Sequence, residues 1–226
     1  MTLERGETLL VTFAIPLVLL VFFSEVPVLS EPTGRRIEFL APGVLGLAVM
    51  SSAMVSLGIA TGFERSYGVL RRLGVTPLGR KRLIVAKMAS VLVVELAQSL
   101  VLLGIAAALG WRPHGEVALG LLGVVLGTAC FSGIGLLLAG VLRAELNLAA
   151  SNGLYVILLL LGGIVFPLDR LGGLAAVARW LPAGALSGVL HPSLGAGGGI
   201  STEAWIALAA WSVIAPLAAV VSFRFD

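Results

Sequence analysis

Apolar segments of about twenty residues recur along this 226-residue sequence, and they constrain the fold more than any other feature. A helix needs about 20 apolar residues to cross about 30 Å of hydrocarbon. With 58% hydrophobic and only 12% charged residues, the chain has too little polar surface for a water-soluble domain of this size. The apolar runs are continuous, whereas the strands of a membrane barrel alternate apolar and polar residues. We therefore expect an all-α, polytopic membrane protein.

Six segments are long and apolar enough to span a bilayer, and together they predict one transmembrane domain over residues 1–226. The predicted spans are approximately 9–29, 40–61, 88–109, 117–142, 148–166 and 203–222. Arg and Lys in short loops mark the cytoplasmic side of a membrane protein. With both termini inside, the inner segments hold ten of the fifteen basic residues, and seven of these lie in the loop 62–87. The sequence therefore predicts cytoplasmic termini and a cytoplasmic loop 62–87.

The segment 167–202, between the fifth and sixth predicted spans, is apolar but broken by prolines and glycines. Its residues Asp169–Trp180 are typical of a short amphipathic helix, and Ala183–Leu190 predict a second one. Neither is long enough to cross a bilayer. We expect both to be re-entrant or to lie on the outer interface, although an ordinary surface loop also fits the pattern.

The loop 62–87 carries an ordered series of helix signals. Glu64–Leu73 predicts a short helix with an apolar stripe, and Gly74 supplies a stop. Thr76 and Pro77 are typical of the cap and first position of the next helix. The basic residues that follow, Arg80-Lys81-Arg82, fit lipid headgroups. A compact helix held between two spans can transmit a force from a soluble partner into the membrane.

This loop resembles the coupling-helix loop of type-2 ATP-binding-cassette (ABC) exporter permeases, in both its residues and its place between the second and third spans. The resemblance extends over nearly the whole chain. In that family a cytoplasmic ATPase docks on this loop, and two permeases pair around a central path. The resemblance implies nine coupling residues: Glu64, Arg65, Gly68, Leu70, Arg71, Arg72, Leu73, Thr76 and Pro77.

The resemblance also implies the partners and the location of the chain. They are two copies of an ABC ATPase subunit that binds ATP and magnesium, a second permease of the same sequence, and the bilayer of a bacterial cytoplasmic (inner) membrane, with no nucleic acid. The chain has no Gly-x-x-x-x-Gly-Lys-Ser/Thr phosphate loop, so we expect no cofactor in it and no enzymatic activity of its own. One departure is the N-terminus, because only Met1–Thr8 precede the first span where the family has an amphipathic helix. That helix is either vestigial here or encoded upstream.

Four polar residues inside the spans are candidates for a translocation path or for polar packing. Glu95 is the only acidic residue well inside a span, and Gln98 lies on the same helical face. Glu95 fits either a proton or substrate site or an interhelical hydrogen bond. In the fifth span, which Asn147 and Ser151 open, Asn152 and Tyr155 fit either substrate contact or packing.

Small and metal-ligating residues say less about function. Gly123 and Gly127 in the fourth span permit close helix approach, within one chain or between two. His114 and His191 lack a third ligand nearby, and Cys130 is the single cysteine. We therefore expect no metal site.

Two alternatives to an exporter permease remain open at this level. An ion-coupled secondary transporter would use Glu95, and a non-transporting membrane assembly factor would need no such residue. If the chain is an exporter, its apolar walls and few intramembrane charges favour a lipophilic or amphipathic cargo such as a drug, a polyketide or a lipid.

Overall fold

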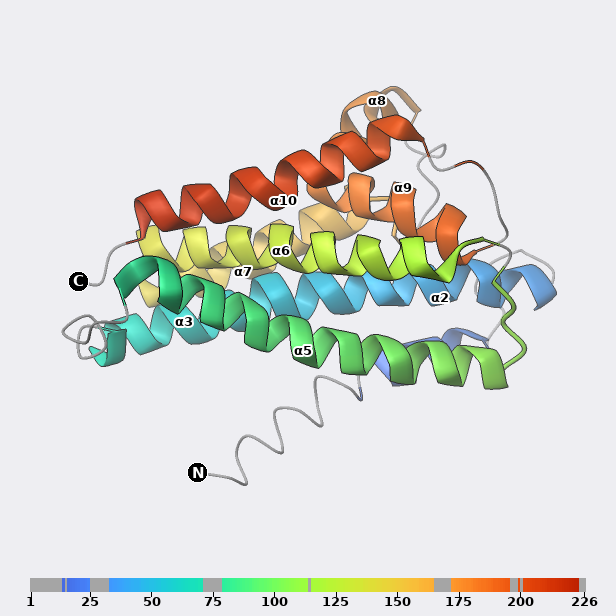
Figure 1. Cartoon of the computed structure of the whole chain (residues 1–226), viewed down its shortest axis with the longest axis horizontal. Helices are drawn as coiled ribbons and strands as arrows, with labels where there is room; N and C mark the ends of the chain where they lie inside the picture. Colours follow the sequence, from blue (N-terminus) through green and yellow to red (C-terminus); the bar gives the residue numbers. More distant parts are fainter. Residues whose placement is uncertain are drawn as a thin grey trace.

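The computed structural model is a bundle of helices, with its long spans running roughly side by side along one axis (Figure 1). It describes residues 14, 16–24, 33–70, 79–113, 115–164, 172–195, 199 and 201–223. Within these residues every regular element is helical and none is a strand. The elements are α2 (Thr33–Val49), η1 (Met50–Ser56), α3 (Leu57–Ser66), α5 (Gly79–Ala108), α6 (Val117–Val141), α7 (Ala144–Leu161), α8 (Ala175–Ala178), α9 (Pro182–Leu194) and α10 (Thr202–Ser222).

The all-α, membrane-spanning fold predicted from the sequence is confirmed. Among the described residues five helices are long and apolar enough to cross a bilayer, and a sixth span is obtained if one bent helix pair counts as a crossing. These five correspond to the second to sixth predicted spans. Of the first, 9–29, the structure describes residue 14 and the helical stretch 16–24, where Leu20 is buried in the core. The side of the membrane on which the termini lie stays a prediction.

The second and third spans are longer than predicted. The second runs as one continuous helical segment, Ile37–Ser66, through a π-helical stretch, η1, at its middle. The third begins at Gly79, nine residues before the predicted start at 88. Most of the predicted loop 62–87 therefore belongs to the ends of these two helices. The fifth span is displaced toward the N-terminus, since α7 occupies Ala144–Leu161 rather than 148–166.

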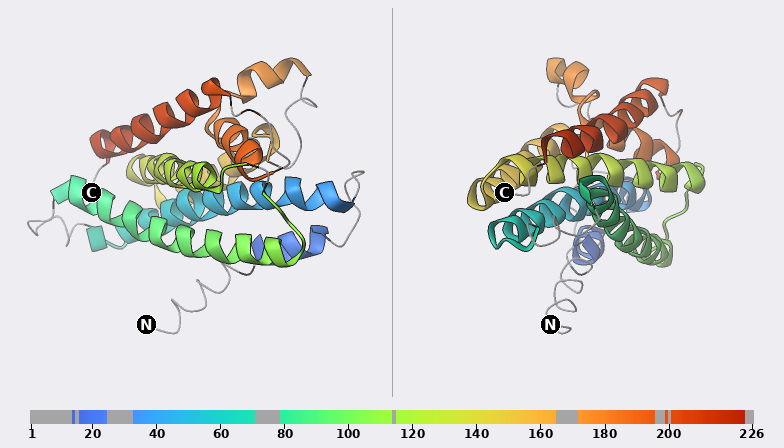
Figure 2. Two further views of the ribbon diagram at one scale, coloured as in Figure 1. Left: turned by 45° about the vertical axis from the view of Figure 1, so that its right-hand side comes forward. Right: turned by 60° about the vertical axis from the view of Figure 1, so that its left-hand side comes forward.

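Helix α6 lies at the centre of the bundle and packs against α2, η1, α3, α5, α7, α9 and α10 (Figures 1 and 2). Glycines make these approaches possible. A Cβ at Gly123 or Gly127 would lie 2.8 Å from Val189 or Leu186 of α9, and a Cβ at Gly135 would lie 2.5 Å from the carbonyl oxygen of Met54 in η1. Gly123 and Gly127 thus serve packing within the chain, which settles the choice that the sequence left open.

The segment between α7 and α10 contains the bent helix pair, as the sequence predicted. A turn beginning at Gly172 leads into α8, and α9 follows at an angle of 93°. The first helix is shorter than the predicted Asp169–Trp180, and residues 169–171 lie outside the described part. The second extends beyond the predicted Leu190 to Leu194. Helix α9 is buried against α6, α2 and α10, so α9 is part of the bundle rather than of a surface loop.

Candidate functional site

The end of the bundle at which α3 ends and α5 begins, called here the loop end, carries the residues that the sequence singled out. Helix α3 stops at Ser66, and the chain turns at Tyr67 and Gly68 before helical structure resumes at Val69. Gly68 has a φ of 72°, in the left-handed region where glycine is favoured. The predicted single helix over Glu64–Leu73 is therefore wrong, because Gly68 breaks it six residues before the expected stop at Gly74.

The predicted coupling residues fall into three groups. Glu64 and Arg65 belong to the last turn of α3, and Gly68 forms the turn. Leu70 is fully buried with Leu57, Ile84 and other apolar residues at the loop end, which anchors the chain just after the turn. The other five lie outside the described residues: Arg71, Arg72, Leu73, Thr76 and Pro77.

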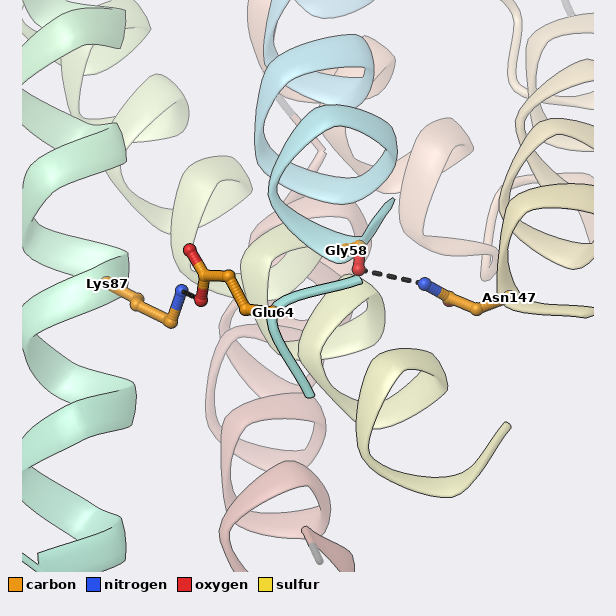
Figure 3. Close-up of polar contacts among 4 residues, drawn as sticks. All are labelled: Gly58, Glu64, Lys87 and Asn147. Carbon is orange, nitrogen blue, oxygen red and sulfur yellow. Dashed lines mark hydrogen bonds and ion pairs between the residues drawn. The ribbon is translucent and has the colours of Figure 1, made fainter. Parts of the chain in front are cut away.

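Glu64 connects α3 to α5. Its Oε2 is 2.5 Å from the Nζ of Lys87, and the two side chains are 39% and 16% exposed (Figure 3). A partly exposed ion pair contributes little stability, about 0–1 kcal/mol. It does mark which residues of these two consecutive helices lie side by side. In the sequence, Lys87 counts only as one of the seven basic residues of the loop 62–87.

Arg65 connects α3 to the end of α6. Its guanidinium Nη1 donates to the carbonyl oxygen of Ala139 at 2.8 Å and lies 3.4 Å from that of Leu142. The last carbonyls of a helix have no partner within the helix, and a cation suits the negative end of its dipole. A half-buried arginine in this place therefore caps α6 and holds its end against α3.

Asn147 connects α3 to α7 and was not among the predicted coupling residues. It is fully buried, its Nδ2 donates to the carbonyl oxygen of Gly58 at 2.8 Å, and its Oδ1 accepts from Ser151 at 3.2 Å (Figure 3). A Cβ at Gly62 would lie 2.6 Å from the same Nδ2. The missing side chain at Gly62 thus admits Asn147, whereas that at Gly58 admits Gly135 of α6.

These contacts together connect α3, from its first turn to its last, to three other helices. Figure 3 shows Lys87 of α5 reaching Glu64 from one side of α3 and Asn147 of α7 reaching Gly58 from the other. Arg65 connects α3 to the C-terminal end of α6 through its bond to the carbonyl oxygen of Ala139. A displacement of the turn at Tyr67 and Gly68 would therefore act on α5, α6 and α7 at once.

The turn itself presents an exposed apolar surface. Tyr67 is 73% exposed and stacks on Phe63 with ring centroids 6.0 Å apart. Val69 is also exposed, while Leu70 beside it is buried. An aromatic ring held out from an anchored turn is suited to contact with a protein partner.

The four candidate residues inside the spans do not form one group. Glu95 and Gln98 are buried on α5, at 0% and 1% exposure. Asn152 and Tyr155 belong to α7, which packs on η1, α3, α6 and α9. Asn152 is exposed, and its Nδ2 donates to the carbonyl oxygen of Leu148 in its own helix, whereas Tyr155 is partly buried against the core. The described residues contain no group of three His, Cys, Asp or Glu that could hold a metal ion.

Comparison with known protein families gives a match over most of the chain. The family model described as ABC-2 type transporter matches residues 3–184, which is most of the chain and includes the whole loop end up to α7. No curated protein and no solved structure matches the sequence.

Proposed function

Because this chain belongs to the ABC-2 type transporter family and is thus a membrane permease subunit, we propose that it exports a lipophilic or amphipathic substrate. Hydrolysis of ATP in a separate ATPase subunit, with magnesium, drives the transport, and that subunit docks on the loop end. The family match favours this proposal over an ion-coupled secondary transporter or an assembly factor.

The observation that carries the proposal is the attachment of α3 to three helices directly before an exposed turn. A partner that pushes on Tyr67 and Val69 acts on a segment that Leu70 anchors in the bundle. From there the displacement reaches α5 through Glu64, α6 through Arg65 and α7 through Asn147. The nine residues that the family resemblance assigns to coupling surround this turn in the sequence.

A second copy of the chain completes the transporter in this proposal, with one ATPase subunit on each permease. Helix α7 supports it, because its exposed side chains include the polar Asn152 among apolar residues such as Val156 and Leu160. A polar side chain facing hydrocarbon is unfavourable, and a path between two protomers would give Asn152 a polar environment. The loop end then faces the cytoplasm of a bacterial cell, and the substrate crosses the cytoplasmic membrane outward.

The test is purification of the chain from its own membranes in mild detergent, followed by identification of what is bound and by an ATPase assay. We expect a soluble ATPase with a phosphate loop to co-purify, and Arg71→Glu/Arg72→Glu to release it. Arg65→Gln should leave the partner bound. It should also reduce, several-fold, the efflux of fluorescent lipophilic dyes from cells, because the contact with α6 is lost. Arg82→Gln is the matched control, since Arg82 is an exposed arginine of the neighbouring helix end.

Two results would contradict the proposal. If the folded chain purifies alone and without ATPase activity, no ATPase subunit binds it. If Arg65→Gln and Arg82→Gln reduce efflux equally while the ATPase stays bound, Arg65 does not transmit the movement.

A further inference from the structure

The buried face of α5 carries polar residues at the middle of the bundle. Glu95, Gln98 and Ser99 are 0%, 1% and 2% exposed. They follow Val91 and precede Leu102, Leu103 and Ala106 at the spacing of one helical face, and those apolar residues pack in the core with α2, η1 and α6. The polar group therefore interrupts an apolar stripe and points the same way as the rest of it.

Two contacts fix which residues of the neighbouring helices lie at the same depth. Glu64 of α3 meets Lys87 of α5, and these consecutive helices are antiparallel (Figure 1). Glu95 lies eight residues beyond Lys87, so it is level with the residue eight before Glu64, which is Ser56 at the end of η1. By the same count Ser99, twelve residues beyond Lys87, is level with Ser52 of η1.

Helix α6 contributes to the same layer. The close approach of Gly135 to the carbonyl of Met54 fixes the register of α6 on η1. Ser132 lies three residues before Gly135 and is therefore level with the residues just before Met54, where Ser52 stands. The layer thus combines Glu95, Gln98 and Ser99 of α5 with Ser52 of η1 and Ser132 of α6.

Within the described residues, the layer brings several oxygen atoms together and has no positive charge to balance Glu95. Among the described residues, both carboxyl oxygens of Glu95 and the hydroxyls of Ser52 and Ser132 are buried without a hydrogen-bond partner. Among the described elements, α6, α2, η1 and α10 make the more extensive contacts with α5, and α3 contacts it through Glu64. Arg65 of α3 lies at the loop end, where its guanidinium donates to carbonyl oxygens of α6. In sequence, η1 and α6 contain no charged residue, and their one titratable group is Cys130. The one charged residue of α10 is Glu203, in its first turn. The charged residues of α2, which lie near its start, are Arg35, Arg36 and Glu38. The nearest cation on α5 is Lys87, roughly 12 Å away along the helix axis and already paired with Glu64.

We propose that Glu95 is the centre of an intramembrane site for a small monovalent cation, at the level of the π-helical stretch η1. A carboxylate in this place requires a positive partner, since an isolated buried charge is strongly disfavoured. Among the described residues of the elements packed on α5, no side chain supplies one at this depth. A proton or an alkali metal ion has the necessary charge and size, and the hydroxyl and amide oxygens of the layer suit either one. The site is distinct from the loop end and goes beyond the proposed export function.

The experiment uses the purified permease alone in lipid nanodiscs, so its result does not depend on the ATPase. Infrared difference spectra are recorded on exchanging choline for sodium or potassium, on changing pH, and on exchanging water for deuterium oxide. Glu95→Gln preserves the shape of the side chain and removes its charge. Glu116→Gln is the matched control, because Glu116 is an exposed glutamate outside the spans.

We expect a buried carboxyl signal in the wild type and in Glu116→Gln that Glu95→Gln lacks. A protonated carboxyl band that shifts in deuterium oxide identifies the cation as a proton. A carboxylate band that responds to sodium or potassium identifies it as a metal ion. Thermal unfolding should agree with the spectra. The unfolding midpoint of the wild type should depend on the concentration of the identified cation, and that of Glu95→Gln should not.

Identical wild-type and Glu95→Gln spectra under every exchange would overturn the proposal. If Glu95→Gln does not fold, Ser52→Ala and Ser132→Ala provide the second measurement. Each removes one oxygen of the layer and should weaken the dependence of the unfolding midpoint on the cation. An unchanged dependence in both would also refute the site.

Discussion

Removal of the Asn147 side chain should destabilise the protein through one identifiable contact. In Asn147→Ala the hydrogen bond to the Gly58 carbonyl is lost. Interhelical hydrogen bonds in membrane proteins contribute about 0.6 kcal/mol on average and up to about 1.7. Because Asn147 is fully buried and also accepts from Ser151, we expect the free energy of unfolding to fall by about 1–2 kcal/mol.

The matched control lies five residues along the same helix. Asn152 is exposed and donates only to the carbonyl of Leu148 within α7. Asn152→Ala should therefore change the free energy of unfolding of the isolated chain by less than about 0.5 kcal/mol. Both variants are measured by reversible unfolding in mixed micelles.

Gly62 allows the same contact to be tested from the opposite helix. A Cβ at this position would lie 2.6 Å from the Nδ2 and 3.5 Å from the Cγ of Asn147, but 3.7 Å from its Cβ. Gly62→Ala should therefore displace the Asn147 amide and cost about as much as Asn147→Ala. In the Asn147→Ala background only the ordinary 3.7 Å contact remains. The added alanine should then be neutral, or stabilising by up to about 1 kcal/mol through its helix propensity.

The double-mutant cycle gives the decisive number. We expect a coupling energy of about 1–2 kcal/mol between positions 62 and 147. Additive effects of Gly62→Ala and Asn147→Ala would refute the reasoning, and so would a loss in Asn152→Ala as large as that in Asn147→Ala.

Two further predictions concern packing and the ion pair. Gly135→Val should strongly reduce the unfolding midpoint and the membrane yield, with a loss of about 3 kcal/mol or more in the free energy of unfolding, because its Cβ would meet the backbone of Met54. Gly153→Ala, whose Cβ would have no atom within 4 Å, should be neutral or stabilising in the same thermal melts. Equal losses in the two variants would contradict this account. Lys87→Glu should weaken the contact of α3 with α5 by about 1 kcal/mol or less, because the new carboxylate repels Glu64. The charge swap Glu64→Lys/Lys87→Glu should restore the unfolding midpoint. A midpoint for the swap that is no higher than that of Lys87→Glu alone would contradict the pairing.

Hydropathy predicted the spanning helices because the bilayer itself imposes their length. It failed at the loop end, where α3 of the second span runs on to Ser66 and α5, the third span, starts at Gly79. Those turns are polar, so they do not register as membrane segments. They stay helical because Glu64, Arg65 and Lys87 find partners on neighbouring helices, and such partners are visible only after folding.

The candidate site was predicted in part for the same reason. The motif singled out Glu64 and Arg65, which contact α5 and α6 in the structure, while their role in coupling stays a prediction. The helix break at Gly68 was missed, because Gly68 and Gly74 are both residues that can end a helix. The contact of Asn147 with Gly58 joins residues 89 apart, so no local pattern contains it. The π-helical stretch has no sequence signature of comparable strength.

The π-helical stretch η1 has a mechanical consequence for the long second span. Each of its i→i+5 hydrogen bonds closes a ring with one residue more than the ring of an α-helix. The span therefore contains more residues at its midpoint than an α-helix of the same length. Conversion of one such turn to α-helical bonding would rotate α3 by about 100° relative to α2 and lengthen the span by about 1.5 Å, with no break in the backbone. A change of hydrogen bonding in η1 would therefore rotate α3 and translate its exposed Tyr67 turn along the helix axis at the same time.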